Sequence, residues 1–326
     1  MSSFDVAIPN YNYGRYLRTC VASVASQDVD ALRILIIDNA STDDSARIAR
    51  EIADADPRVE ARIRPRNLGP HASFNEAVDW AASDYFLILC ADDRITPGAL
   101  RRAGAVLDAR PDVHLTCGRT RLRPAAGRAP LGREAEGEWR TLDGDRALRR
   151  LCALARNDIG GPTAIVRTAI QKEVGHYRAE LPHTDDLEMW LRFTLKGGVA
   201  ATDAYQAEVA VHAGSQSASV ADILRWNMEF EAAFRCFFRN EGAGRPDADA
   251  LLAAALSTLG ERAFCSALTT LARGEGGARA LLRYSARLRG FPRAALPPFG
   301  YALRRLAERR RAGGGARAAH LTLGGT

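Results

Sequence analysis

Residues 33–45 read RILIIDNASTDDS, and they indicate the fold class of the amino-terminal half of the chain. The run from Arg33 to Ile37 is almost wholly apolar, which is typical of a strand in a parallel sheet that is covered on both faces. Asp38 ends this strand, and residues 41–44 then provide an N-cap for a helix that we expect to end near Ala55. A buried strand that passes at once into a helix is the repeating unit of an α/β fold.

The same alternation of strand and helix continues on both sides of this unit. Strands are predicted at 4–8, 59–63 and 85–89, and helices at 15–27, at 71–82 and from Thr96-Pro97 onward. We therefore expect a mainly parallel central sheet flanked by helices. Ligands bind such sheets outside the carboxyl ends of the strands, so the residues of interest directly follow the strands. They are Pro9 to Tyr11, Asp38-Asn39 and Ala91 to Asp93.

The second half of the chain changes character. Residues 118–140 are rich in Arg, Gly and Pro and predict a loop or irregular hairpin, before strands at 163–166 and 208–211 and a helix at about 185–195. From residue 222 onward only helices are expected, at 223–238, 248–271, 278–288 and 301–311. We therefore predict an α/β domain at 1–217, a basic helical extension at 218–312 and a disordered tail at 313–326.

Composition excludes several classes of protein. The chain has 326 residues, of which 47% are apolar and 26% charged, as in globular proteins. Its amino terminus has no basic region before an apolar one, and the longest near-continuous apolar run, at 85–91, is far shorter than the roughly 20 residues of a membrane span. The six cysteines include no CxxC pair, which argues against zinc and redox sites. We expect a cytoplasmic, soluble protein with reduced thiols.

The positive charge is concentrated near the carboxyl terminus. Between residues 273 and 317, twelve arginines face two glutamates, whereas the formal charge of the whole chain is only +6. The remainder is therefore mildly acidic, which argues against a nucleic-acid partner. The basic helices can serve as a peripheral contact with an anionic membrane, as a homodimer contact, or as a solvated cap on the α/β domain.

The candidate residues for catalysis, ligand binding and metal binding are acidic. Asp92 and Asp93 suit a divalent cation, or else the N-cap of a helix that begins at Thr96. Asp38 suits either a hydrogen bond to a base or sugar or simple turn chemistry. Asp186 begins an amphipathic run, so it is either a general base or a partner of the helix dipole. The sequence has no GxGxxG after its first strand, no Walker A motif and no GxSxG elbow.

In their order along the chain, six blocks resemble the family 2 glycosyltransferases with the GT-A fold. The resemblance covers roughly residues 4–217. The blocks are Val6 to Asn12, Gly14 to Gln27, Ile36 to Ser45, Asn67 to Gly69 with Asn75, Asp84 to Asp93, and Thr184 to Arg192, followed by a closing segment at Val211 to Ser217.

The resemblance implies a Rossmann-like GT-A domain that uses a nucleotide sugar, with UDP- or dTDP-sugars as the expected donors. It implies an inverting transfer to a glycan, a lipid-linked or a small-molecule acceptor, with Mn²⁺ or Mg²⁺ as cofactor. The residues it assigns are Pro9, Tyr11 and Asp38 for the nucleobase, Arg66 or Arg64 for the diphosphate, Asp92 for the ribose or the metal, Asp93 for the metal, His212 as a further metal or phosphate contact, and Asp186 as the general base.

Two positions depart from the family pattern. Cys90 stands where many members have an acidic residue, and Asp185 stands where glutamate is more common, which preserves the charge. The alternative function is an inactive module that binds nucleotides or partners on a glycosyltransferase-like fold without turnover.

Overall fold

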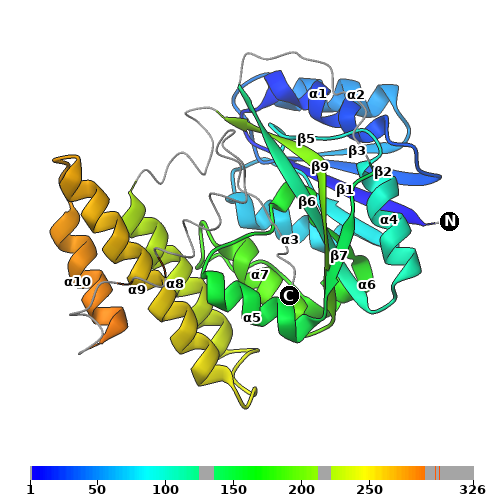
Figure 1. Ribbon diagram of the computed structural model, residues 1–326. Helices are drawn as coiled ribbons and strands as arrows, with labels where there is room; N and C mark the ends of the chain where they lie inside the picture. Colours follow the sequence, from blue (N-terminus) through cyan, green and yellow to red (C-terminus); the bar gives the residue numbers. More distant parts are fainter. Residues whose placement is uncertain (1, 125–135, 212–221, 291–297, 299–300, 302–326) are drawn as a thin grey trace.

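The computed structural model describes residues 2–124, 136–211, 222–290, 298 and 301 (Figure 1). The strands within these ranges are β1 (Ser3–Asn10), β2 (Ala31–Asp38), β3 (Val59–Ile63), β4 (Tyr85–Ile88), β5 (Arg94–Ile95), β6 (Val113–Pro124), β7 (Trp139–Leu142), β8 (Ile165–Arg167) and β9 (Gly198–Val211). The helices are α1 (Gly14–Ala25), α2 (Ser45–Ala55), α3 (Pro70–Trp80), α4 (Ala99–Ala109), α5 (Gly144–Leu154), the short η1 (Gly161–Thr163), α6 (Thr168–Val174), α7 (Asp185–Thr194), α8 (Ile223–Arg239), α9 (Ala248–Ala272) and α10 (Ala278–Arg289).

The described strands form one mixed sheet in the order β3-β2-β1-β4-β8-β6-β9-β5, with β7 paired to β9. Strands β1 to β4 run parallel to one another, whereas β8 lies antiparallel between β4 and β6. In the pairing of β1 with β2, Asn10 lies opposite Asp38. The predicted parallel sheet is therefore confirmed, and it brings the loops that follow these strands to one edge.

Helices cover both faces of this sheet. Ile34 and Ile36 pack in a core with α1, α2 and α4, whereas Leu35 and Ile37 pack in a second core with α3 and α7. All four of these side chains are fully buried, as their uninterrupted apolar run predicts. The fold class predicted from the sequence is thus correct.

The helical extension is joined to the α/β domain by a common core. Leu148 of α5, Leu187 of α7, Phe234 of α8 and Leu259 of α9 are all fully buried in one apolar cluster. In Figure 1, the green helices α5 and α7 lie between the sheet and the yellow to orange helices α8 to α10. Movement of α7 is therefore restrained by the extension as well as by the sheet.

Helix α10 buries its apolar side chains within the protein. Leu281 and Tyr284 pack in a cluster with residues of α9, whereas Arg279 and Arg283 are exposed. These leucine and tyrosine side chains are consequently not available for insertion into a bilayer, and the exposed arginines are what α10 offers to an anionic surface. Membrane contact, a homodimer and a cytoplasmic location stay predictions from the sequence.

Helix α9 is long and apolar enough to cross a membrane, the one such helix within the described ranges. The central helix of a soluble protein meets the same test of length and composition, so this finding alone is weak evidence. Helix α9 packs against α5, α8 and α10.

The structure differs from the predicted elements in several places, among them β5, β7 and α6, which were not predicted, and β9, which begins ten residues before the predicted strand at 208–211. Helix α4 begins at Ala99 rather than at Thr96, because Gly98 at its N-cap has a positive φ of 76°. Strand β6 and helix α5 were not predicted, and residues 118–124 belong to β6 rather than to a loop. Arg119 and Arg121 stack on Tyr205 of β9, so pairing with β9 supports an arginine-rich strand that has no alternating apolar pattern. The tail at 313–326 and residues 302–311 lie outside the described residues.

Ala40 provides a test of backbone strain in the turn after β2. Its φ is 59°, a left-handed conformation that costs an L-residue with a Cβ about 1–2 kcal/mol. Glycine removes this strain, but it also gives the unfolded chain more entropy, which offsets part of the gain. We therefore expect Ala40→Gly to raise the free energy of unfolding, as measured by urea denaturation, by about 0.5–1 kcal/mol. The control is Ala22→Gly at an exposed position of α1, which should lower that free energy by about 1 kcal/mol. A less stable Ala40→Gly protein would contradict this account of the turn.

Candidate functional site

Asp38 joins the ends of β1 and β2. Its buried carboxylate accepts hydrogen bonds from Asn10 Nδ2 at 2.7 Å, Ser41 Oγ at 2.6 Å and the Ser41 backbone N–H at 3.1 Å. These contacts bind the turn after β2 to the neighbouring strand, so the predicted turn chemistry is present. The carboxylate is therefore saturated largely by the protein itself.

Two residues predicted for the nucleobase flank this turn. Pro9 is the penultimate residue of β1, and its carbonyl oxygen accepts a hydrogen bond from the Ala91 N–H at 3.3 Å. Tyr11 follows β1 and is 44% exposed, which leaves its ring accessible beside the turn. Asn12 Oδ1 accepts a hydrogen bond from the Thr42 N–H at 2.7 Å and holds the two loops together. Pro9, Tyr11 and Asp38 therefore lie at one edge of the sheet.

The structure separates the two arginines that were considered for a diphosphate. Arg64 donates hydrogen bonds to Asn39 Oδ1, Ser73 Oγ and the Ala72 carbonyl, and it forms an ion pair with Glu76. This guanidinium is thus committed to the protein interior. Arg66 is exposed on the loop between β3 and α3, and it makes no ion pair within the described ranges. Arg66 is consequently the arginine of the two that is able to meet a ligand.

Asp92 and Asp93 lie in the loop after β4, and each residue is only 7% exposed. The Asp93 N–H donates to the Cys90 carbonyl at 2.9 Å, and Asp93 Oδ1 accepts from the Ala210 N–H of β9 at 3.1 Å. Burial, followed by the charge of Asp92, raises the pKa of Asp93 well above its ordinary value. The N-cap alternative is excluded because α4 begins six residues after Asp93, with Gly98 at its N-cap.

This pair has the chemistry of a hard-cation site. Two adjacent buried carboxylates supply only oxygen ligands, and a bound cation would compensate the charge that burial and proximity make unfavourable. Within the described part of the chain, no group of three or more His, Cys, Asp or Glu side chains converges as a metal site. Mg²⁺ commonly takes one or two carboxylates and completes its shell with water and substrate phosphates, so the pair fits such an ion. His212 lies outside the described residues.

Asp185 and Asp186 occupy the first turn of α7, where the helix dipole favours negative charge. Asp186 Oδ2 accepts a hydrogen bond from Asn157 Nδ2 at 2.6 Å, and its Oδ1 accepts from the Leu187 N–H at 2.7 Å. Burial and the neighbouring charge of Asp185 raise the pKa of Asp186 to about 7. A carboxylate with this pKa is suited to general-base catalysis near neutral pH.

Asp185 and the Asp92-Asp93 pair act on one buried neighbour, Cys90. Burial, Asp92, Asp93 and Asp185 together raise the pKa of the Cys90 thiol well above its ordinary value. Asp185 and Asp186 likewise contribute, after burial, to the raised pKa of Tyr177. Such electrostatic effects require short separations in a folded protein. The structure thus brings together residues that are about 90 positions apart in the sequence.

Tyr13 is a residue at this site that sequence reasoning missed. Burial and the charge of Asp92 are the two largest causes that raise its pKa to about 12, so its hydroxyl stays a hydrogen-bond donor across the physiological range. The available signal was its place in the polar turn after β1, directly before Gly14, but tyrosine at helix entry is also typical of ordinary packing.

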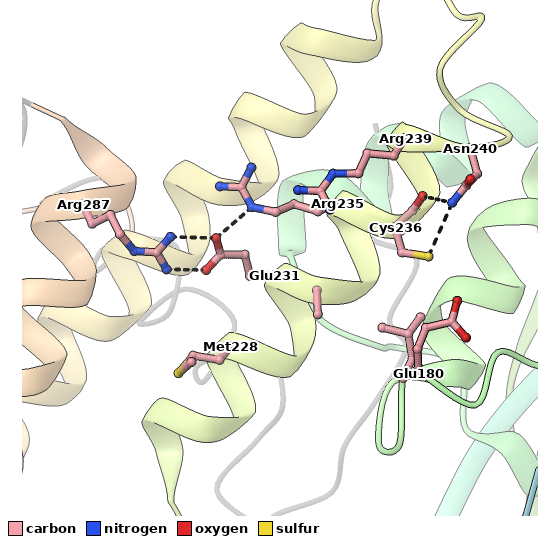
Figure 2. Close-up of a pocket in the computed structure, with 10 residues that line it drawn as sticks. Glu180, Met228, Glu231, Arg235, Cys236, Arg239, Asn240 and Arg287 are labelled. Atoms are coloured by element: carbon pink, nitrogen blue, oxygen red, sulfur yellow. Dashed lines mark hydrogen bonds and ion pairs between the residues drawn. The ribbon is translucent and has the colours of Figure 1, made fainter.

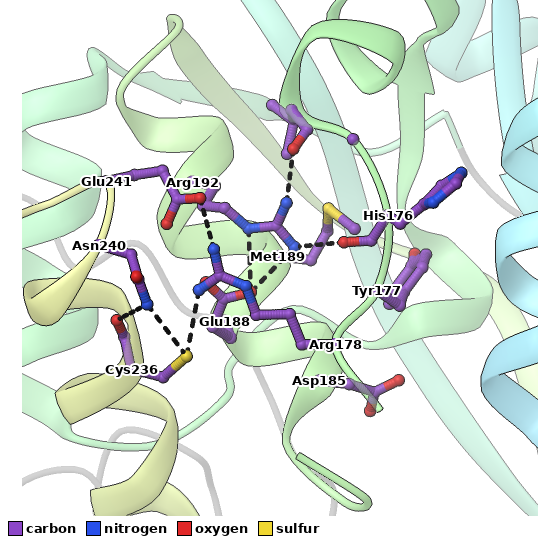
Figure 3. Close-up of polar contacts among 12 residues, drawn as sticks. His176, Tyr177, Arg178, Asp185, Glu188, Met189, Arg192, Cys236, Asn240 and Glu241 are labelled. Atoms are coloured by element: carbon purple, nitrogen blue, oxygen red, sulfur yellow. Dashed lines mark hydrogen bonds and ion pairs between the residues drawn. The ribbon is translucent and has the colours of Figure 1, made fainter. Parts of the chain in front are cut away.

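Helix α7 is fixed from both sides by a buried polar network that was likewise not predicted (Figure 3). Glu188 has no exposed surface, and it accepts hydrogen bonds from Arg178 at 2.8 Å and from Arg192 at 2.9 Å. Arg178 also contacts Cys236 Sγ of α8 at 3.1 Å, and Thr184 Oγ1 donates to the Glu229 carbonyl at 3.0 Å. The extension therefore helps to orient the helix that carries Asp186.

A pocket of about 540 Å³ lies along α8 (Figure 2). One of its lining residues, Glu231, forms ion pairs with Arg287 at 2.6 Å and with Arg235 at 2.8 Å. None of the site residues predicted from the sequence lines it. The lining residues are Glu180, Leu181, Met228, Glu231, Ala232, Arg235, Cys236, Arg239, Asn240 and Arg287.

The fold is similar to that of solved glycosyltransferases. The structure of S. aureus TarS residues 1–349 in complex with UDP-GlcNAc matches with a TM-score of 0.55 and 17% identity over 97% of this chain and 93% of that chain. The mannosyltransferase PcManGT from Pyrobaculum calidifontis, in complex with GDP-Man and Mn²⁺, matches with a TM-score of 0.55 and 17% identity over 95% and 83%. At these identities the likeness shows the fold.

Sequence comparisons identify the family. An uncharacterized protein of Mycobacterium tuberculosis is 28% identical over 60% of this chain and 63% of its own length. An uncharacterized glycosyltransferase of Haemophilus influenzae is 33% identical over 31% and 41%. The chain thus spans less than two thirds of these curated relatives. Residues 5–174 match the model for glycosyl transferase family 2. Since this match covers more than half of its residues, the chain belongs to glycosyl transferase family 2.

Proposed function

We propose that this protein transfers a sugar from a nucleoside-diphosphate sugar to an acceptor hydroxyl in a single inverting displacement. The observation that carries the proposal is the buried Asp92-Asp93 pair in the loop after β4 together with Asp186 at the start of α7, whose pKa is raised to about 7 by burial and by Asp185. The similarity in fold to proteins whose structures contain UDP-GlcNAc and GDP-Man supports a nucleotide-sugar donor.

Asp186 is the proposed general base. Its carboxylate takes the proton of the acceptor hydroxyl, and the hydroxyl oxygen attacks the anomeric carbon. The bond from that carbon to the diphosphate oxygen breaks, and the leaving nucleoside diphosphate takes the electron pair. Asn157 donates to Asp186 Oδ2 and the Leu187 N–H donates to Oδ1, and these two hydrogen bonds fix the orientation of the carboxylate. No covalent intermediate on the protein is needed.

The other residues would bind the donor. Pro9 and Tyr11 border the proposed nucleobase site, over the turn that Asp38 closes, and Arg66 is the proposed contact of the diphosphate. Asp93 and Asp92 would hold Mn²⁺ or Mg²⁺, which when bound supplies positive charge for the departing diphosphate. Tyr13, with its high pKa, remains a neutral hydrogen-bond donor beside this pair.

A thermal-shift panel tests the donor site. We expect one of UDP, dTDP or GDP to raise the Tm of the full chain by several degrees in the presence of Mn²⁺, and by less in EDTA. A ligand at one hundred times its Kd stabilises the folded state by about 2.7 kcal/mol, which is the basis of this expectation. A panel with no shift for any nucleotide contradicts the donor site. Binding without donor hydrolysis or transfer to any acceptor would instead favour the inactive binding module.

A further inference from the structure

His71 is near Asp186, and the resemblance to the family assigns it no role. It lies in the first turn of α3, and its Nε2 is 3.2 Å from Asp185 Oδ2, with only 12% of the histidine side chain and 11% of the aspartate side chain exposed. The imidazole packs edge-on against Phe74, whose ring in turn packs against Tyr177. The pair thus connects the α3 side of the sheet to the turn that carries the proposed base.

The carboxylates of Asp185 and Asp186 repel each other at the start of α7, and the contact with His71 places a titratable imidazole beside them. Asp185 and Asp186 are adjacent in the sequence, and the charges of both contribute to the raised pKa of the buried Tyr177. Two like charges in a poorly hydrated place disfavour each other's ionised form. A general base has to be ionised to accept a proton, so an unpaired Asp185 would oppose the chemistry that Asp186 performs.

We propose that His71 is a positioning residue for the general base: as an imidazolium it pairs with Asp185 and thereby permits Asp186 to ionise and act near neutral pH. This role rests on the proposed function. The contact with Asp185 raises the pKa of His71, more than burial lowers it, which favours the positively charged ring toward neutral pH. The cation on α3 and the base on α7 therefore belong to one coupled titration.

The charged and titratable groups around this pair come from four places. The turn of α7 contributes Asp185 and Asp186, and α3 contributes His71. The segment before α7 contributes Tyr177 and Glu180, and the loop after β4 contributes Cys90. Arg192 of α7 is the cation that acts on Tyr177, and Asn157 is the neutral donor to Asp186. Among these groups, His71 is the one whose contact with Asp185 is an ion pair.

Substitutions at His71 and at Asp185 should shift the pH profile of kcat in opposite directions. His71→Gln removes the positive charge and keeps a side-chain N–H. The negative charge of Asp185 is then no longer compensated, and it disfavours ionisation of Asp186 more strongly. We expect the acidic limb of the pH profile of kcat to move to higher pH by about one unit. Asp185→Asn removes the negative charge, so the limb should move to lower pH by a similar amount. A purely structural role would lower kcat in both variants and leave the limb in place.

The pH profile of the full chain is measured in the transfer assay with the donor found in the panel. His176→Gln is the matched control, because His176 forms an ion pair at 2.8 Å with Asp79, on an exposed surface. We expect an unmoved limb in this control. In parallel, NMR titration of the imidazole that disappears in His71→Gln should give a pKa above the ordinary value of about 6.5 in the wild-type protein. In Asp185→Asn its pKa should be at or below that ordinary value, because burial then acts without the carboxylate.

The outcomes separate this inference from the proposed function. Limbs displaced in opposite directions, together with the altered His71 titration, support the role of His71. An unmoved limb in His71→Gln, when Asp186→Asn is inactive, overturns the role of His71 and leaves the base in place. An active Asp186→Asn enzyme overturns the base and with it this role. The NMR titration needs no activity, and an ordinary His71 pKa in the wild-type protein overturns the ion pair itself.

Discussion

Replacement of Asp186 by asparagine is expected to lower kcat by about 10²–10⁴-fold, the usual contribution of a general base. The amide has nearly the same shape but cannot accept the proton of the acceptor hydroxyl. Nucleotide affinity should change little, because the ends of β1 and β2 that border the proposed donor site lie on other elements. The measurements are steady-state transfer rates and the nucleotide-induced shift in Tm.

The same variant should report on stability with a defined sign. The pKa of Asp186 is about 7 in the folded protein, compared with 3.8 for an ordinary aspartate, so the unfolded chain loses this proton first as the pH rises. The wild-type protein therefore loses stability between about pH 4 and pH 7, whereas Asp186→Asn does not. We therefore compare the Tm of Asp186→Asn with that of the wild-type protein at two pH values. The Tm of the variant minus that of wild type should be more positive at pH 8 than at pH 4.

Asp79→Asn is the control for this substitution, because Asp79 is an exposed aspartate of α3 whose partner is His176. It should keep wild-type turnover. If Asp186→Asn retained turnover within a few-fold of wild type, the proton would have to go to another group, and Asp185 would be the first to test.

Asp93→Asn is expected to abolish cation-dependent turnover in a protein that remains folded. The substitution removes one of the two carboxylates available to Mn²⁺ or Mg²⁺, and with it a negative charge that favours binding of a hard cation. The amide oxygen still accepts the hydrogen bond from the Ala210 N–H, so the loop after β4 should keep its position. Transfer assays across a range of Mn²⁺ concentrations give the measurement.

The Tm in EDTA distinguishes loss of the cation from loss of structure. Because Asp93 is buried next to Asp92, neutralising it removes an unfavourable charge, and the Tm without metal should be at least that of wild type. Mn²⁺ should raise the Tm of the wild-type protein and not that of Asp93→Asn. Asp84→Asn, before β4 and outside the acidic pair, is the control and should keep the response to Mn²⁺. Full turnover in Asp93→Asn would remove this residue from the metal role.

Local sequence determined the fold class and the position of the candidate groups along the chain. The apolar run ending at Ile37 has to be covered on both faces, and a strand with such burial alternates with helices in an α/β fold. In a parallel sheet, residues after consecutive strands reach one edge, which is why Tyr11, Asp38 and Asp93 could be grouped before their structure was known.

The tertiary structure decided which of these groups are available and which partners act on them. Arg64 and Arg66 are equivalent in the sequence, yet Glu76 and Asn39 occupy the guanidinium of Arg64 alone. Pairing of β6 with β9, and the contact of His71 with Asp185, join positions that are about 80 to 115 residues apart. Such contacts depend on how helices and strands pack, and no local pattern of apolar and polar residues encodes them. The sequence by itself therefore pointed to Asp186 as the candidate base, and the tertiary structure decided that His71 of α3 lies against its neighbour, Asp185.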